Sequence, residues 1–67
     1  MIKITLNGKD HALETALNVD ELLASIGLAG KPVVVELNQK ALFPREYANS
    51  MLENGDKLEI ITIAAGG

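Results

Sequence analysis

The chain has 67 residues, of which nine are acidic, six are lysine or arginine and one is histidine, so its net charge is −3. A chain of this length forms one domain with a small core, because it buries only about 60% of its extended surface. The sequence contains no cysteine, which excludes disulfides, thiolate zinc sites, iron–sulfur ligation and a cysteine nucleophile. The acidic balance, without a run of lysine and arginine, argues against nucleic-acid binding.

The acidity has two interpretations, namely solubility and a partner with a basic docking surface. The longest apolar run is far shorter than the ~18 residues of a membrane-spanning helix, and no charged segment followed by an apolar one indicates a signal peptide. We therefore expect a cytoplasmic protein. The single histidine, His11, has no second histidine with which to hold a metal ion, and we expect a partly exposed strand residue there.

The N-terminal segment MIKITLNG predicts a strand followed by a tight turn. Ile2, Ile4 and Leu6 alternate with polar residues, which is the period-two pattern of a half-buried strand. Asn7-Gly8 is the strongest short hairpin motif, because both turn positions tolerate a positive φ angle. The segment KDHALET then returns as the second strand, with Leu13 as its clearest core residue.

The segment NVDELLASIG predicts a short amphipathic helix. Asn18 is a good N-cap, and Glu21, three residues later, completes a capping box. Gly27 is suited to the left-handed conformation that often ends a helix. A helix this short must pack on a sheet to be stable. Its apolar stripe, with the spacing i, i+3, i+4 and i+7, consists of Val19, Leu22, Leu23 and Ile26.

Further strands are predicted at residues 33–37, 41–43 and 57–63. The β-branched run VVVEL favours a strand with much of both faces covered, whereas Pro44 fits the end of a short strand and the start of one helical turn. The resulting order is β-β-α-β-β-β, with the first and last strands as central neighbours. This order predicts an α+β fold of the ubiquitin-like β-grasp class, with a mixed four- to five-stranded sheet and one main helix packed on one face.

The final strand carries hydrophobic residues on both of its faces. Leu58 and Ile60 fit the core face, so that Glu59, Ile61 and Ile63 point the other way. Ordinary surface hydrophobicity and cover by a neighbouring loop are two explanations for such exposed residues. The third interpretation is a docking face, formed by these three outward residues, that directs the end of the chain into a partner.

After a domain predicted to span residues 1–63, the sequence ends in Ala64, Ala65, Gly66 and Gly67, which we expect to form a flexible tail. A frayed terminus is one interpretation. The tail has no side chain larger than a methyl group, however, so it can pass in an extended form through a narrow channel. Its terminal carboxylate is a weak electrophile that adenylation with ATP would activate. Displacement of AMP by an amine would give a conjugated protein, and displacement by sulfur would give a thiocarboxylate.

Several segments together resemble the ThiS family of thiamine-biosynthesis sulfur carriers, and the resemblance covers essentially the whole chain. They are VDELL, VVVELNQ, FPREYA, NGDKLEI and the terminal AAGG. The resemblance implies that an E1-like, ThiF-type adenylyltransferase activates the carboxylate of Gly67, which becomes a thiocarboxylate with sulfur derived from a cysteine desulfurase. It also implies that a ThiG-type thiazole synthase takes this sulfur, with Ala64, Ala65 and Gly66 threading into the partner's site.

The resemblance implies a carrier and co-substrate instead of an enzyme, with no catalytic residue, no bound cofactor and no metal, and with ATP used by the activating partner. We expect a monomer when free, without nucleic-acid or membrane partners. Three alternatives stay open: a carrier for another pathway, of molybdopterin type; a ubiquitin-like modifier conjugated to lysines; and an interaction domain with a passive tail. Arg45 receives no family role, and a solvated charge, a salt bridge and a partner contact are all possible for it.

Overall fold

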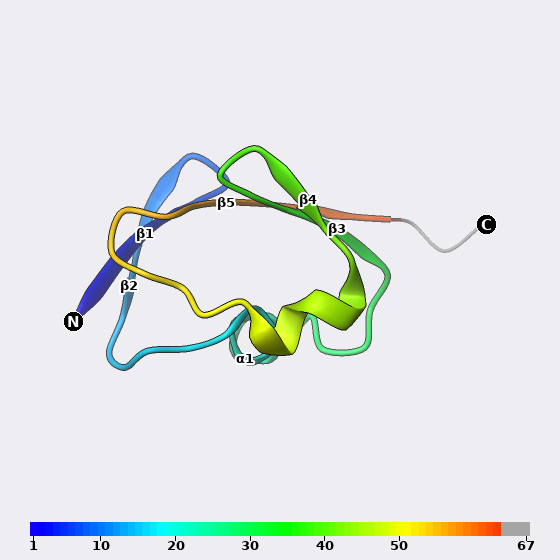
Figure 1. The fold of residues 1–67 in the computed structure, drawn as a ribbon, viewed down its shortest axis with the longest axis horizontal. Coiled ribbons are helices and arrows are strands. Elements are labelled where there is room, and N and C mark those ends of the chain that lie inside the picture. Colours follow the sequence, from blue (N-terminus) through cyan, green and yellow to red (C-terminus); the bar gives the residue numbers. More distant parts are fainter. Residues whose placement is uncertain (64–67) are drawn as a thin grey trace.

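The structure is a computed structural model that describes residues 1–63, and the predicted tail, residues 64–67, lies outside the described residues. A sheet is covered on one face by one α-helix and one 3-10 helix (Figure 1), which confirms the predicted fold class and element order. The elements in chain order are β1 (Ile2–Leu6), β2 (Lys9–Leu13), α1 (Val19–Ser25), β3 (Val33–Leu37), β4 (Lys40–Leu42), η1 (Pro44–Asn49) and β5 (Lys57–Thr62).

The sheet is mixed and has the strand order β2-β1-β5-β3-β4. The last strand, β5, lies at the centre, parallel to β1 and antiparallel to β3, as the sequence predicts. The edge strands β2 and β4 pair antiparallel with β1 and β3. In Figure 1 the sheet runs across the top, both helices lie beneath it, and β5 ends at the opposite end of the sheet from the N-terminus. The final strand is therefore held from both sides, which fixes its direction.

The core lies between the sheet and the two helices. Its strand residues alternate with outward residues, because successive side chains of a strand point to opposite faces. Within residues 1–63 no charged side chain is buried, so hydrophobic burial alone accounts for the core, at about 2 kcal/mol for each large side chain. The buried residues are Ile4, Leu13, Val19, Leu22, Leu23, Val35, Tyr47, Leu52, Leu58 and Ile60.

The helix α1 begins and ends as its sequence predicts. Asn18 Oδ1 accepts a hydrogen bond from the Glu21 N–H at 2.8 Å, and Glu21 Oε1 accepts one from the Asn18 N–H at 2.9 Å, which completes the capping box. Gly27 follows the helix with a φ angle of +81°, a conformation that few other residues adopt at low cost. In the described part of the chain, no helix is long and apolar enough to cross a membrane.

The turn between β1 and β2 uses the predicted Asn7-Gly8 pair, with φ angles of +50° and +82°. The side chain of Asn7 has a second function. Its Oδ1 accepts a hydrogen bond from the Ile60 N–H at 2.7 Å, and its Nδ2 donates to the Ile60 carbonyl at 3.2 Å. The last residue of β1 paired with β5 is Leu6, opposite Leu58. The Asn7 amide thus continues the β1–β5 ladder after the backbone of β1 has turned away.

Two further asparagine side chains hold the start of β5 and the turn before it. Asn38, in the β3–β4 turn, accepts a hydrogen bond from the Lys57 N–H at 2.9 Å and donates to Asp56 Oδ1 at 3.1 Å. Asn54 Oδ1 accepts a hydrogen bond from the Lys3 N–H at 2.7 Å. These contacts connect segments far apart in the sequence, so β5 is anchored by side-chain amides as well as by its neighbouring strands.

One expectation about β3 is wrong. The run VVVEL, residues 33–37, predicts a strand with much of both faces covered, but Val34 is 41% exposed and only the opposite face, with Val35, is covered by the helices. A β-branched residue also fits an open pleated surface, because its favoured rotamers suit the extended backbone. The run therefore reflects strand propensity in addition to burial.

Replacing Asn7 separates the hydrogen bonds of its side chain from its backbone conformation. Asn7→Gly removes both bonds to Ile60 but tolerates positive φ, and we expect the free energy of unfolding to fall by about 2 kcal/mol. Asn7→Ala adds the strain of a left-handed alanine, which brings the expected loss to about 3 kcal/mol. Urea denaturation measures both values. Losses of less than about 0.5 kcal/mol, the size of an ordinary surface effect, would show that this amide does not anchor β5.

Candidate functional site

The end of β5 is the described part of the predicted functional site. The predicted covalent site Gly67 and the predicted threading residues 64–66 lie outside the described residues. Ile63, which precedes them, donates its N–H to the Pro32 carbonyl at 3.0 Å. Because Thr62 pairs with Val33, this bond extends the β3–β5 ladder by one residue. The sheet therefore holds the backbone up to the last described residue.

The outward residues of β5 lie where the sequence predicts. Ile61 is 60% exposed and Ile63 is 50% exposed, whereas Ile60 is only 7% exposed in the core. Glu59 is exposed as well, and the strand alternation places it on the same face as Ile61. The predicted division of β5 into a core face and an open face is confirmed, while the docking role of the open face stays a prediction.

Two residues outside the predicted docking set extend this hydrophobic surface. Val34 is the register partner of Ile61 across β3 and β5. Phe43 is 60% exposed and follows Leu42, the register partner of Val35, so it continues the same row on the far side of β3. The strand alternation in VVVEL could have identified Val34, but the position of Phe43 depends on the pairing of β4. We call this surface the outer patch, which consists of Val34, Phe43, Ile61 and Ile63.

Arg45 lies at the border of the outer patch. Its guanidinium carbon is 5.0 Å from the centre of the Phe43 ring, within the range of a cation–π interaction. Phe43 is itself held at the start of η1, because its N–H donates to Glu46 Oε1 at 2.7 Å. Arg45 is exposed, which agrees with the solvated surface charge expected for it, and a partner contact stays a prediction.

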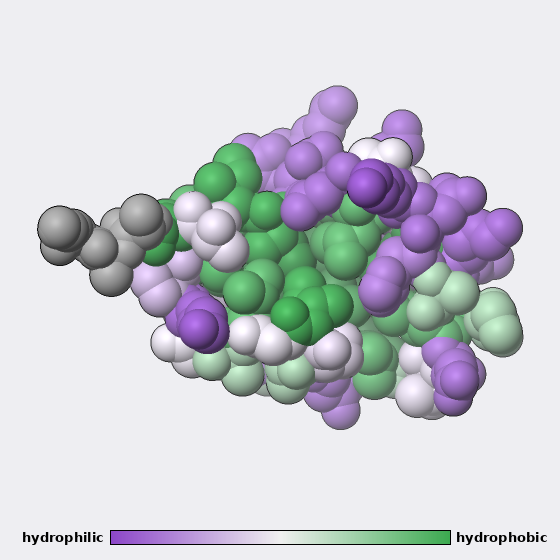
Figure 2. All heavy atoms as spheres, turned by 180° about the vertical axis from the view of Figure 1, so that it is seen from behind, coloured by the Kyte–Doolittle hydropathy of each residue, from purple (hydrophilic) through white to green (hydrophobic). Residues whose placement is uncertain are grey.

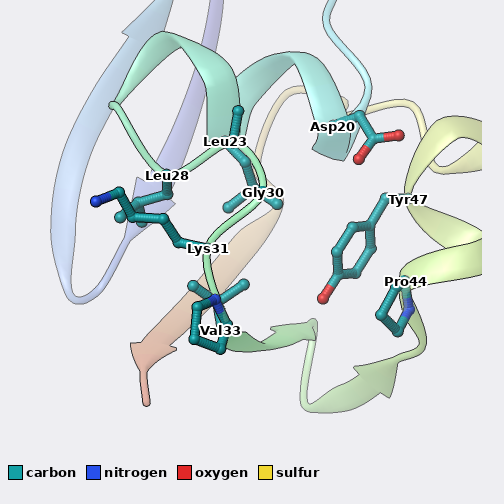
Figure 3. Close-up of a pocket in the computed structure, with 10 residues that line it drawn as sticks. Asp20, Leu23, Leu28, Gly30, Lys31, Val33, Pro44 and Tyr47 are labelled. Atoms are coloured by element: carbon teal, nitrogen blue, oxygen red, sulfur yellow. The ribbon is translucent and has the colours of Figure 1, made fainter. Parts of the chain in front are cut away.

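A pocket of about 500 Å³ lies on the covered side of the sheet, and we call it the helix-side pocket. Residues of α1, of the loop between α1 and β3, and of the start of η1 form its walls. Figure 3 shows the Tyr47 ring as one wall, with its hydroxyl directed toward the Val33 side and Leu23 across from it. Asp20 lies beside Tyr47, whereas the amine of Lys31 points away from the tyrosine.

Within residues 1–63, Tyr47 is the one residue whose surroundings clearly shift its pKa. Burial raises the pKa of Tyr47 above its usual value, and the nearby carboxylate of Asp20 raises this pKa further, because both disfavour the phenolate. Tyr47 is only 6% exposed. Tyr47 therefore stays protonated at neutral pH and presents a hydroxyl, not a charge, to the pocket.

The face turned away from the viewer in Figure 1 is also rich in hydrophobic residues. Figure 2 shows hydrophobic side chains gathered across the middle of this face and continuing to the end of the described chain. Hydrophilic side chains lie along the upper edge and on the right of this view, away from that end. Apolar side chains that are only partly buried against the core include Leu6, Ile26 and Leu28. The molecule thus exposes apolar area beyond the outer patch.

The titratable residues do not gather into a metal site in the region covered by the structure. Residues 1–63 contain no group of three or more His, Cys, Asp or Glu side chains that could hold a metal ion. His11 is half-buried in the edge strand β2, opposite Ile4 of β1, which confirms the partly exposed strand position predicted for it.

The central parallel pair β1–β5, the two flanking hairpins and the helix on one face define a ubiquitin-like β-grasp protein. The ThiS family model matches residues 4–67. This chain belongs to the ThiS family.

Individual relatives agree with this assignment. The crystal structure of a thiamine biosynthesis protein (ThiS) from Geobacter metallireducens is 32% identical with a TM-score of 0.83, over 98% of this chain and 100% of that chain. The sulfur carrier protein ThiS of Thermus thermophilus is 33% identical over 64 residues, 96% of this chain and 98% of the relative. A thiazole synthase of Paramagnetospirillum magneticum is 32% identical over 66 residues, 98% of this chain but only 20% of that protein's length.

The raised pKa of Tyr47 predicts how stability depends on pH. An unfolded tyrosine ionises near its usual pKa of 10.0, whereas the folded one ionises at higher pH. The contribution of Tyr47 is therefore fully present below pH 10 and is lost as the pH rises from there through the folded pKa. Because Tyr47 is the only tyrosine, phenolate absorbance can follow it directly.

We expect the absorbance midpoint of the folded chain to lie above that of the urea-unfolded chain. We also expect Tyr47→Phe to lose less stability than the wild type does between pH 9.5 and 11, a window around the usual tyrosine pKa of about 10. Equal midpoints in the folded and unfolded chains would contradict the environment described for this ring.

Proposed function

We propose that this chain is a sulfur carrier protein of thiamine biosynthesis, a co-substrate and not an enzyme, and that the carboxylate of Gly67 carries the sulfur. The observation that supports this most is the family match, which runs to the last residue of the chain and so includes the terminal Gly66-Gly67 pair. The absence of cysteine agrees with it, since no side-chain thiol is present to bear the sulfur.

The proposed chemistry has two steps at the carboxylate of Gly67. A carboxylate oxygen of Gly67 attacks the α-phosphate of ATP on an E1-like, ThiF-type adenylyltransferase, which forms the acyl-adenylate and releases pyrophosphate. The cysteine desulfurase supplies sulfur as a persulfide, which a thiol reduces to sulfide as the thiol itself is oxidised to a disulfide. Sulfide then attacks the acyl carbon, and a C–S bond forms as the C–O bond to AMP breaks. The net change is one oxygen replaced by one sulfur, and ATP is a substrate of the partner, not a cofactor of this chain.

A ThiG-type thiazole synthase is the proposed acceptor of the sulfur. The relative from Paramagnetospirillum magneticum supports this proposal, because a protein named thiazole synthase matches nearly the whole of this chain over a fifth of its own length. In the proposed cycle Ala64, Ala65 and Gly66 thread into the acceptor, since they have no side chain larger than a methyl group and can follow a narrow channel.

Residues 1–63, the part of the chain that the structure describes, would present the tail to both partners. The β3–β5 ladder holds the backbone as far as Ile63, and the outer patch lies on the open face of the same end of the sheet. Large hydrophobic residues clustered on an exposed surface commonly form protein–protein contacts. We therefore propose that the outer patch docks on a partner while the tail enters the partner's active site.

The covalent site can be tested by mass spectrometry. Incubation of the chain with its cognate adenylyltransferase, ATP and sulfide should raise the intact mass by the difference between one sulfur and one oxygen atom. Deletion of Gly66 and Gly67 should abolish the gain but leave the melting temperature unchanged, because the described core and ladder end at Ile63. A wild-type chain that stimulates pyrophosphate release but gains no sulfur, or a deletion variant that still gains it, would refute the proposal.

The docking role of the outer patch can be tested by charge insertion. The double change Ile61→Asp and Ile63→Asp should weaken binding to the adenylyltransferase by about 2 kcal/mol or more, because both side chains are exposed and would meet an apolar partner surface. Calorimetric titration measures this affinity. Ala12→Asp on the edge strand β2 is the matched control, since Ala12 is also exposed but lies far from the end of β5 in the strand order.

The control variant should bind as the wild type does. Unchanged affinity of the Ile61 and Ile63 double variant would show that the outer patch is not the interface. Loss of its cooperative unfolding transition would instead contradict the exposure of the two side chains.

A further inference from the structure

The helix-side pocket lies at the same end of the molecule as the outer patch, but on the other side of the sheet. Pro32, one of its lining residues, accepts the hydrogen bond from Ile63 at the end of β5. Val33 and Pro44 also line the pocket, and each is the chain neighbour of an outer-patch residue. A protein that surrounds the end of β5 therefore meets the pocket as well as the patch.

The lining of the pocket combines apolar walls with one negative charge. Leu23, Leu28 and the Tyr47 ring provide apolar surface, while Asp20 provides a carboxylate. In Figure 3 the Tyr47 ring extends from the Asp20 side into the middle of the pocket. Lys31 also belongs to the lining, but its amine points away from Tyr47 and Asp20, so it does not neutralise the carboxylate.

These features match the chemistry of a basic side chain better than that of a purely apolar one. A lysine or arginine has an apolar stem that packs on hydrophobic surface and a cation at its end. An aromatic ring face attracts such a cation, and a carboxylate pairs with it. An apolar side chain would fill the volume but would leave the exposed carboxylate of Asp20 without a partner. The chain's net charge of −3 adds a general attraction for a basic surface.

We propose that the helix-side pocket receives a lysine or arginine side chain of the thiazole synthase that accepts the tail. The inference rests on the proposed function, because it takes the synthase as the partner. The stem of the basic residue packs between Leu23, Val33 and the ring of Tyr47, and its cation pairs with the carboxylate of Asp20. The partner then contacts both faces of this end of the sheet, through the outer patch on one face and through this pocket on the other.

Calorimetric titration of the full-length chain with its cognate thiazole synthase tests this inference. Asp20→Asn removes the carboxylate and should weaken binding about fivefold at low salt, the effect of a solvent-accessible ion pair, with a smaller difference at high salt because the charges are then screened. Asp20→Lys places a cation in the pocket and should weaken binding further. Asp20 lies in the first turn of α1, so its replacement could also destabilise the helix. Melting temperatures of both variants are therefore measured to check that they are folded.

Asp10→Asn and Asp10→Lys are the matched controls, because they make the same changes of charge on the edge strand β2, where Asp10 is exposed. Both should leave the affinity within twofold of wild type once salt screens long-range effects. Equal binding of the wild type and the Asp20 variants would overturn this inference but would leave the proposed function unaffected. Failure of the wild-type chain to bind the synthase would overturn the inference together with the choice of acceptor, while the sulfur-transfer assay with the adenylyltransferase tests the carrier function separately.

Discussion

The structure depends on the position of β5 between β1 and β3. Hydrogen bonds from both neighbours fix the direction of this strand, and the Ile63–Pro32 bond holds its backbone to the last described residue. On the side where β1 ends, the Asn7 amide replaces a strand partner through its two bonds to Ile60. A small domain can hold its C-terminal strand in this way without a disulfide or a metal, because β5 pairs with a neighbouring strand along both of its edges.

The alternation of β5 links folding to recognition. Leu58 and Ile60 enter the core, while Ile61 and Ile63 face outward beside the point where the tail begins. The same short segment therefore stabilises the fold on one face and presents a hydrophobic surface on the other. The pocket with Asp20 and Tyr47 lies on the opposite side of this end, so the proposed recognition features surround the end of β5 instead of being spread over the molecule.

The features that could be predicted from the sequence are those that depend on neighbouring residues. The Asn18 capping box, the Asn7-Gly8 turn and the two faces of β5 each follow from patterns a few residues long. The bonds from Asn7 to Ile60 join residues 53 positions apart, and no local pattern indicates that pairing. The exposure of Val34 and Phe43 and the pocket beside Tyr47 likewise depend on how β3, β4 and η1 pack together. The residues of the tail fit a thiocarboxylate on Gly67 and conjugation of Gly67 to lysine side chains equally well. Only the family resemblance favours the thiocarboxylate.

The central claim is that a folded body without cysteine carries its sulfur on one terminal carboxylate. Fragmentation of the sulfur-loaded chain in the mass spectrometer tests this claim most directly, because each fragment reports where the added mass lies. The account predicts that every fragment containing Gly67 carries the replacement of oxygen by sulfur and that fragments ending before Gly67 keep their unmodified mass. Added mass on fragments from residues 1–63, or a chain joined through Gly67 to lysine side chains in place of sulfur, would contradict it.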